Sequence, residues 1–295
     1  MKILMLLSTL FFFNSLKAQD FGFELYQFPE LDKNYRPGVD TGFSKYLTKS
    51  LRGSKKIVLT FDDGPDEILT PKLLDILKKH NVEATFFVLT SKINAKNYWI
   101  IKRMVDEGHT LASHHHDHGN SNTKTKEQYT TELTSTIKTV AQIHEKEYAR
   151  NREVYYRFPY GNYGASSRDY HHLNIMKEVS QNLFGDNCVN FVFWDIDTVD
   201  WLADMTSDDI VQNVIANIKG GKAFDFGKNN GKYVKTTYTI KYPLGGGVVL
   251  MHDVHKNTVA AVDKLLTKLK SENIEVVNLQ DVEEYSYQGK ACYLQ

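Results

Sequence analysis

The segment KIVLTFDDGP, residues 56–65, decides the fold that we expect for this chain. Its first part, Ile57 to Phe61, is β-branched and apolar and predicts a buried strand. Asp62 and Asp63 follow directly, and Gly64-Pro65 predicts a turn. Two adjacent carboxylates repel each other, so we expect a bound cation or basic neighbours at this strand end. For this segment taken alone, an ordinary surface turn is the commoner interpretation.

Residues 1–18 have the composition of a secretory signal peptide. Lys2 precedes an apolar run from Ile3 to Phe13, and Ala18 offers a small residue at the expected cleavage site. The run is too short for a membrane span, although an N-terminal anchor is the alternative interpretation. We therefore expect an exported protein, periplasmic or secreted, without stable membrane insertion.

The charge balance gives no reason to expect nucleic acid as a partner. The chain has 36 basic and 36 acidic residues, and removing residues 1–18 takes away Lys2 and Lys17, which leaves 34 basic residues. The remaining chain is long enough for one large domain. Cys188 and Cys292 are the only cysteines; export permits a disulfide between them, and two separately buried thiols are the alternative. The oligomeric state is not predicted.

Strands and helices alternate along most of the chain, which predicts β-α-β units and a parallel sheet. Seven strands of this kind predict a closed or nearly closed barrel, a distorted (β/α)7 type. The expected strands cover 57–61, 84–89, 109–112, 154–158, 191–196, 248–252 and 274–278. The expected helices begin with Thr70 as the N-cap, cover about 95–107, 126–149 and 172–181, follow a cap at Ser207 to Asp209, and cover 258–272.

The barrel domain is expected over residues 55–280, between an irregular wrapping segment at 19–54 and a C-terminal tail at 281–295. Residues 220–247 form an insertion whose alternating stretch, Tyr233 to Tyr242, suggests a hairpin. The insertion connects a helix to the next strand, and such connections lie on the barrel face away from the active site. We therefore expect a surface elaboration without a catalytic role.

Five polar clusters each fall at the C-terminal end of an expected strand. Because the carboxyl ends of parallel strands meet at one face of a barrel, this is where an active site is expected. His114 and His118 stand four residues apart, a spacing that on a helical turn brings two imidazoles together, and Asp63 offers a third ligand. Such a set leaves positions open for water and substrate. For the histidines alone, a solvated loop is the alternative.

The five clusters resemble, in order, the motifs of the NodB-homology polysaccharide deacetylases, the fourth carbohydrate esterase family. The matching segments are TFDDG (60–64), H-x-x-x-H (114–118), RFPYG (157–161), DTVDW (197–201) and LMH (250–252). The resemblance covers about residues 55–280. One departure is His115, where the family usually has Ser or Thr directly after the first metal histidine. It leaves the ligand spacing intact, but it changes the hydrogen bonding expected in that loop and could let a neighbouring imidazole compete for the metal.

The resemblance implies a divalent metal, with Zn²⁺ expected first and Co²⁺, Ni²⁺ or Mn²⁺ as alternatives. A carboxylate that binds the metal is a poor base, whereas its free neighbour can accept a proton from water. The implied roles are metal binding by Asp63, His114 and His118, general base for Asp62 with Arg157 as its partner, and general acid for His252 with Asp200 behind it. The implied substrate-binding residues are Pro159, Tyr160, Trp201 and Leu250, while Asp197 suits a structural hydrogen bond at least as well.

The resemblance further implies removal of N-acetyl groups from a glycan, with peptidoglycan N-acetylglucosamine as the first expectation and chitin oligosaccharides as the second. Three other hypotheses remain open at this point. They are a sugar O-acetyl esterase, a non-catalytic glycan-binding protein, and a metal-dependent oxygenase, which also uses two histidines and one carboxylate.

Overall fold

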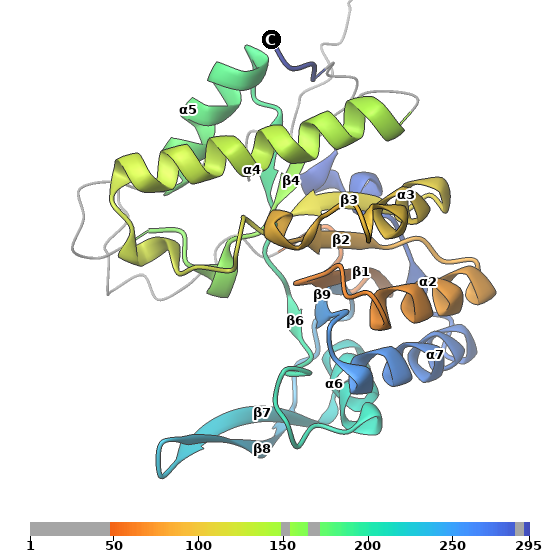
Figure 1. Ribbon diagram of the computed structural model, residues 1–295. Helices are drawn as coiled ribbons and strands as arrows, with labels where there is room; N and C mark the ends of the chain where they lie inside the picture. The colour runs from red at the N-terminus through yellow and green to blue at the C-terminus, as the bar shows by residue number, and fades with distance from the viewer. Residues whose placement is uncertain (1–47, 149–153, 165–171, 287–291) are drawn as a thin grey trace, which may run out of the picture.

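The computed structural model describes residues 48–148, 154–164, 172–286 and 292–295 (Figure 1). The expected signal peptide and most of the expected wrapping segment lie outside the described residues. Within them, no helix is both long enough and apolar enough to cross a membrane.

A parallel sheet forms the centre of the fold, as the alternation predicts. Its strands run in the order β5-β4-β3-β2-β1-β9-β6, with β10 paired beside β1. All of these pairings are parallel, so the carboxyl ends of the strands share one edge. The bounds are β1 Lys56–Asp62, β2 Thr85–Val88, β3 Thr110–Ser113, β4 Val154–Tyr156, β5 Val189–Phe191, β6 Ile196–Asp197, β9 Gly247–His252 and β10 Glu275–Val276.

The single strand expected at 191–196 is in fact two strands, which lie at opposite ends of the distorted barrel sheet. β5 pairs with β4, whereas β6 pairs with β9 at the other end of the sheet. The segment must therefore change partners partway along, which one regular strand cannot do. At the change, the Asp195 carboxylate accepts hydrogen bonds from the main-chain N–H groups of Thr48 (2.8 Å) and Val248 (2.7 Å).

The bounds of the helices are α2 Leu69–His80, α3 Tyr98–Asp106, α4 Lys126–Glu147, α5 His172–Phe184, α6 Ser207–Lys219 and α7 Lys256–Ser271. In Figure 1, α2, α3 and α7 lie along one side of the sheet, α4 and α5 lie at its upper end, and α6 lies at its lower end.

Two expected helix caps are wrong by a few residues. The carboxylate of Asp66 accepts from the N–H groups of Ile68 and Leu69, so α2 begins before Thr70. The hydroxyl of Thr70 donates instead to Asp253. At α6 the cap is Thr206, one residue before the expected group, and it exchanges hydrogen bonds with Asp209 as a capping box.

The side chains of β1 alternate between the apolar core under the helices and the interior of the barrel. Ile57, Leu59 and Phe61 pack with apolar side chains of α2, α3 and α7. Residues two apart on a strand share a face, so Thr60 and Asp62 point the other way, into the barrel. Each fully buried apolar side chain contributes about 1.5–3 kcal/mol to folding. The strand that anchors the core therefore also positions Asp62.

The insertion forms an antiparallel hairpin of β7 (Gly221–Asn229) and β8 (Lys232–Ile240), as the alternation suggested. Its two-residue turn, Asn230-Gly231, has both φ angles positive (49° and 77°), which matches the type I′ turn favoured in hairpins. In Figure 1 the hairpin extends from α6 at the lower edge of the molecule.

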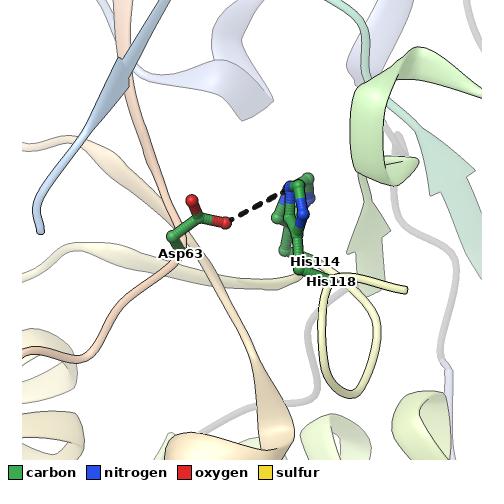
Figure 2. Close-up of side chains that lie close together, drawn as sticks. All are labelled: Asp63, His114 and His118. Atoms are coloured by element: carbon green, nitrogen blue, oxygen red, sulfur yellow. Dashed lines mark ion pairs between the residues drawn. The ribbon is translucent and has the colours of Figure 1, made fainter. Parts of the chain in front are cut away.

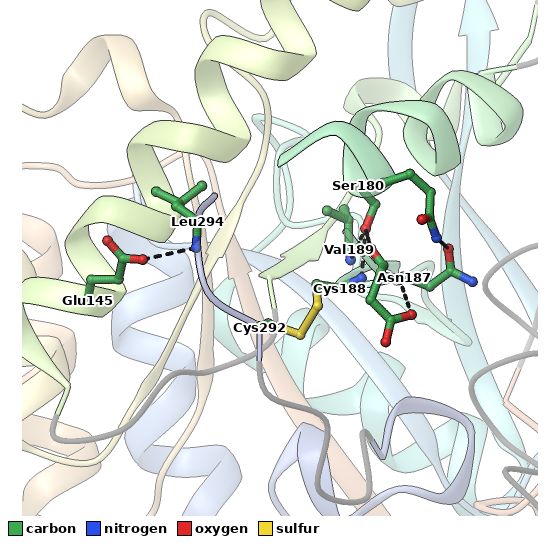
Figure 3. The surroundings of a disulfide bond; sticks show 9 residues. Glu145, Ser180, Asn187, Cys188, Val189, Cys292 and Leu294 are labelled. Atoms are coloured by element: carbon green, nitrogen blue, oxygen red, sulfur yellow. Dashed lines mark hydrogen bonds between the residues drawn. A yellow bond between two sulfur atoms is a disulfide. The ribbon is translucent and has the colours of Figure 1, made fainter. Parts of the chain in front are cut away.

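Cys188 and Cys292 are joined in a disulfide, so the alternative of two separate thiols is wrong (Figure 3). Their Cα atoms are 5.6 Å apart and the bond closes a loop of 104 residues. The residues after the bond are held by further contacts: the N–H of Leu294 donates to Glu145 (3.1 Å) and that of Gln295 to the carbonyl of Leu183 (2.9 Å). The disulfide therefore fixes residues 292–295 against α4 and α5.

Candidate active site

A cavity of about 480 Å³ opens at the carboxyl edge of the sheet and contains most of the predicted site residues. Its volume lies in the range usual for small-molecule sites. Its polar lining consists of Asp62, Asp63, His114, His118, Asp197 and His252. Its aromatic and apolar lining consists of Phe158, Tyr160, Trp194, Trp201, Phe226, Tyr233 and Leu250.

Asp63, His114 and His118 converge in this cavity (Figure 2). Oδ1 of Asp63 lies 3.6 Å from Nε2 of each histidine. Ligands bound tetrahedrally to Zn²⁺ at its usual bond lengths lie about 3.4 Å from one another. Among the described residues, Asp63 Oδ1 is buried and has no hydrogen-bond partner, which is costly for a carboxylate unless a cation balances it. The three side chains therefore fit a divalent metal.

The tautomer of His114 also suits metal binding. Its Nδ1 lies 3.0 Å from the carbonyl oxygen of Arg157, to which it can only donate, and so Nε2 carries the free lone pair. Burial lowers the pKa of His114 well below its ordinary value. The imidazole is therefore neutral, the form in which histidine binds metals.

The two metal-site histidines lie in the loop after β3, and not on a helical turn as the spacing suggested. The loop brings them together through left-handed backbone conformations at His115 (φ 73°) and His118 (φ 61°). Asp63 (φ 74°) and Tyr160 (φ 59°) share this uncommon conformation. Such residues cost free energy and cluster at functional sites.

His115 does not compete for the metal, contrary to one expectation from the sequence. Its ring is fully buried, beside the rings of Tyr129 and Tyr156, and its Nε2 lies 3.1 Å from the carboxylate of Glu132. Burial lowers the pKa of His115 to about 4. The departure from the family pattern is thus accommodated by packing beneath the loop.

Asp62 and Arg157 form a buried ion pair with an Nη1–Oδ1 distance of 2.8 Å. The guanidinium also donates to the Thr60 hydroxyl (2.7 Å) and to the carbonyl oxygens of Val192 (3.0 Å) and Phe193 (3.1 Å). Burial raises the pKa of Asp62, and the charge of Arg157 opposes this rise. Arg157 therefore joins β1 to the segment between β5 and β6 and holds Oδ1 of Asp62. The other oxygen, Oδ2, faces Nε2 of His114 at 3.7 Å.

His252 is paired with a buried carboxylate. Its Nδ1 donates to Oδ1 of Asp200 (2.7 Å), and Oδ2 accepts from the His252 main chain (2.7 Å) and the Thr258 hydroxyl (2.6 Å). Burial alone would lower the pKa of His252, but the charge and hydrogen bond of Asp200, together with the smaller effects of the Asp62 and Asp63 charges, raise it to about 10. The imidazole is therefore cationic at neutral pH.

The remaining predicted residues have different surroundings. Trp201 and Leu250 line the cavity, as does the exposed Tyr160. Pro159 is buried at the start of the short 3-10 turn η5 (Pro159–Gly161) and is not part of the cavity wall. Asp197 accepts from the N–H of Val199 (2.8 Å), whose φ is 56°, which is the structural hydrogen bond that the sequence allowed. Burial raises the pKa of Asp197 to about 6.

The expectation that the insertion lies away from the site is wrong, because Phe226 and Tyr233 of the hairpin line the cavity. The hairpin does begin after α6, on the far side of the barrel. Each strand, however, has nine residues and spans about 30 Å at about 3.3 Å per residue, enough to reach the carboxyl edge. Sequence reasoning missed the dipeptide Asn230-Gly231, which is typical of a two-residue hairpin turn. This signal predicts a strand on each side of the turn, including the strand before it.

Comparison with known proteins agrees with the motifs. A family model described as polysaccharide deacetylase matches residues 49–177. Peptidoglycan-N-acetylglucosamine deacetylase PgdA of Listeria monocytogenes is 31% identical over 229 residues, 78% of this chain and 39% of that protein. The chain thus spans about two fifths of the length of that relative. Peptidoglycan-N-acetylmuramic acid deacetylase PdaA of Bacillus subtilis is 32% identical over 229 residues, 77% of this chain and 71% of that protein.

A solved structure is also similar to this chain. The Bc1960 peptidoglycan N-acetylglucosamine deacetylase, crystallised with a naphthalenyl benzamide ligand, superposes with a TM-score of 0.56 at 28% identity. The match covers 80% of this chain and 90% of that chain.

Proposed function

The chain belongs to the polysaccharide deacetylase family, and from this premise we propose that it hydrolyses the N-acetyl groups of N-acetylglucosamine residues in peptidoglycan. The observation that carries the proposal is the convergence of three groups in one cavity: a set of metal ligands, a carboxylate outside that set (Asp62) and a cationic imidazole (His252). The substrate class follows the names of the relatives, and export remains the expectation from residues 1–18.

Asp63, His114 and His118 would hold the metal. Two imidazoles and one carboxylate suit Zn²⁺, while Co²⁺, Ni²⁺ and Mn²⁺ are alternatives. When bound, the cation would polarise the acetamide carbonyl and lower the pKa of water in the site towards about 7.

Asp62 is the general base in this proposal. Arg157 occupies its Oδ1, so Oδ2 is the oxygen that faces the metal site and accepts the proton of the attacking water. A carboxylate with a raised pKa is a stronger base near neutral pH than an ordinary aspartate. We assign stabilisation of the oxyanion to the main-chain N–H of Tyr160.

His252 is the general acid. The bond between water oxygen and the carbonyl carbon forms, the C–N bond breaks, and the nitrogen must gain a proton to leave as an amine. The imidazolium that Asp200 maintains supplies this proton. Trp201 and Leu250 form the apolar wall for the acetyl methyl group. The products are acetate and a glucosamine residue.

The experiment compares metal-replete and chelator-treated protein on peptidoglycan fragments and on chitin oligosaccharides, with loss of the acetyl mass followed by mass spectrometry. Metal-dependent loss from peptidoglycan fragments is the expected result. Fragmentation of the product distinguishes glucosamine from deacetylated muramic acid, which is the sugar named for the Bacillus subtilis relative. Loss from chitin oligosaccharides alone would favour the second glycan, and no loss from either would refute the proposed function.

A further inference from the structure

The β7–β8 hairpin presents two aromatic side chains that the proposed chemistry does not use. Phe226 is 43% exposed and Tyr233 is 49% exposed. Both line the cavity that contains the metal ligands and His252. Leaving aromatic side chains half exposed to water is unfavourable, and an exposed apolar patch beside a reactive site marks a binding surface.

Phe226 and Tyr233 form a cluster with Trp201. The ring centroids of Trp201 lie 4.9 Å from Phe226 and 5.4 Å from Tyr233, and those of Phe226 and Tyr233 are 5.5 Å apart. All three contacts are edge-to-face. We call these three residues the aromatic wall. It extends the apolar surface of Trp201 outward from the reacting centre.

The hairpin is anchored on the domain, so the aromatic wall is held in place before a ligand binds. Phe224 is buried in a small apolar cluster with Val199 and Leu202, and its main chain exchanges two hydrogen bonds with the Asn213 side chain (2.7 and 3.0 Å). Nζ of Lys235 lies 2.9 Å from the Asp209 carboxylate. A surface fixed in this way loses little entropy on binding.

We propose that the aromatic wall is a glycan-binding subsite that holds a sugar next to the one being deacetylated. The inference rests on the proposed function and extends it to substrate length. Pyranose rings carry C–H groups on their faces, and these are attracted to the negative faces of aromatic rings. A glycan whose acetyl group lies at the metal site must continue out of the cavity, and the aromatic wall is continuous with that site. The ligand class is a β-linked oligosaccharide of N-acetylated sugars.

The test measures binding separately from catalysis. Zinc-loaded protein with Asp62→Asn, which prevents turnover, is titrated by calorimetry with N-acetylglucosamine and with its β-1,4-linked tetrasaccharide. Adding Phe226→Ala and Tyr233→Ala should weaken tetrasaccharide binding roughly tenfold, equivalent to about 1.4 kcal/mol. The affinity for the monosaccharide should change much less. Tyr233→Phe, which keeps the ring, should bind the tetrasaccharide as tightly as the parent.

Tyr242→Ala is the matched control, because Tyr242 lies in the same insertion, is 91% exposed and does not line the cavity. Zinc content checks that each variant keeps its site. Equal tetrasaccharide affinity with and without the two alanines, or no tetrasaccharide binding at all, would overturn the inference. If the protein binds the tetrasaccharide through the aromatic wall but wild type releases no acetate, the proposed function fails, and the aromatic wall remains a glycan-binding site without a role in deacetylation.

Discussion

Replacing Asp200 by Asn should shift the alkaline limit of activity to lower pH. In wild type, Asp200 raises the pKa of His252 to about 10 against the opposing effect of burial. A general acid works only while protonated, so wild-type activity on an acetamide should fall as the pH rises towards about 10. Without the negative charge of Asp200, the largest effect that opposes burial is lost, so the pKa of His252 should fall well below its wild-type value and the alkaline limit of activity should move to lower pH.

The magnitude follows from the role of the acid. General acid catalysis contributes about 10²–10⁴-fold, so Asp200→Asn should lower kcat/KM for the acetamide at pH 8 by at least about 10². The value of kcat/KM for an acetyl ester should fall much less, because the leaving group of an ester needs less protonation. The assay is acetate release from both substrates between pH 5 and 10 at constant zinc content.

Thr258→Val is the control for this prediction. It removes one hydrogen bond to Oδ2 of Asp200 but keeps the charge, so the alkaline limb should stay near its wild-type position. An Asp200→Asn enzyme with the wild-type alkaline limb would show that the limb does not report His252, and the assignment of the general acid would be wrong.

Three further variants test other parts of the site and fold. Asp62→Asn should abolish acetate release while zinc content stays near one per chain, whereas His114→Ala should lose both activity and zinc. Metal analysis together with the activity assay checks this pair. An active Asn variant would refute the assignment of Asp62 as the general base. Arg157→Met should lower the free energy of unfolding by about 3–5 kcal/mol in urea titrations, because it leaves the buried Asp62 carboxylate uncompensated. Cys188→Ser with Cys292→Ser should lower it by about 2–4 kcal/mol, whereas the entropy of a loop of 104 residues alone gives about 4.7.

The parallel barrel and the position of the site could be predicted because both depend on local sequence patterns. Apolar runs such as Ile57 to Phe61 are typical of buried strands, and each polar cluster falls at the C-terminal end of its strand. The motifs also matched a family in a fixed order. The brief β5 and β6 could not be separated, because residues 189–197 are apolar throughout most of their length and the change of partner occurs only in three dimensions.

The reach of the hairpin into the site could not be predicted, because the topological rule describes where a connection starts rather than how far it extends. Phe226 and Tyr233 come from a helix-to-strand connection, which the rule assigns to the far face. The contacts that direct the hairpin towards the site involve residues distant in sequence. Asn213 binds the main chain of Phe224, and Asp209 binds Lys235, and neither pairing has a sequence signature.

Two adjacent aspartates can serve one cavity only because the strand ends between them. Neighbouring residues on a strand point to opposite faces, so after Asp62, which faces the barrel interior, the next side chain would point towards the helices as Phe61 does. Asp63 escapes this alternation through its left-handed conformation (φ 74°), while its N–H still donates to the carbonyl of Phe87 in β2 (3.2 Å). The backbone strain at Asp63 thus places a metal ligand beside the proposed base.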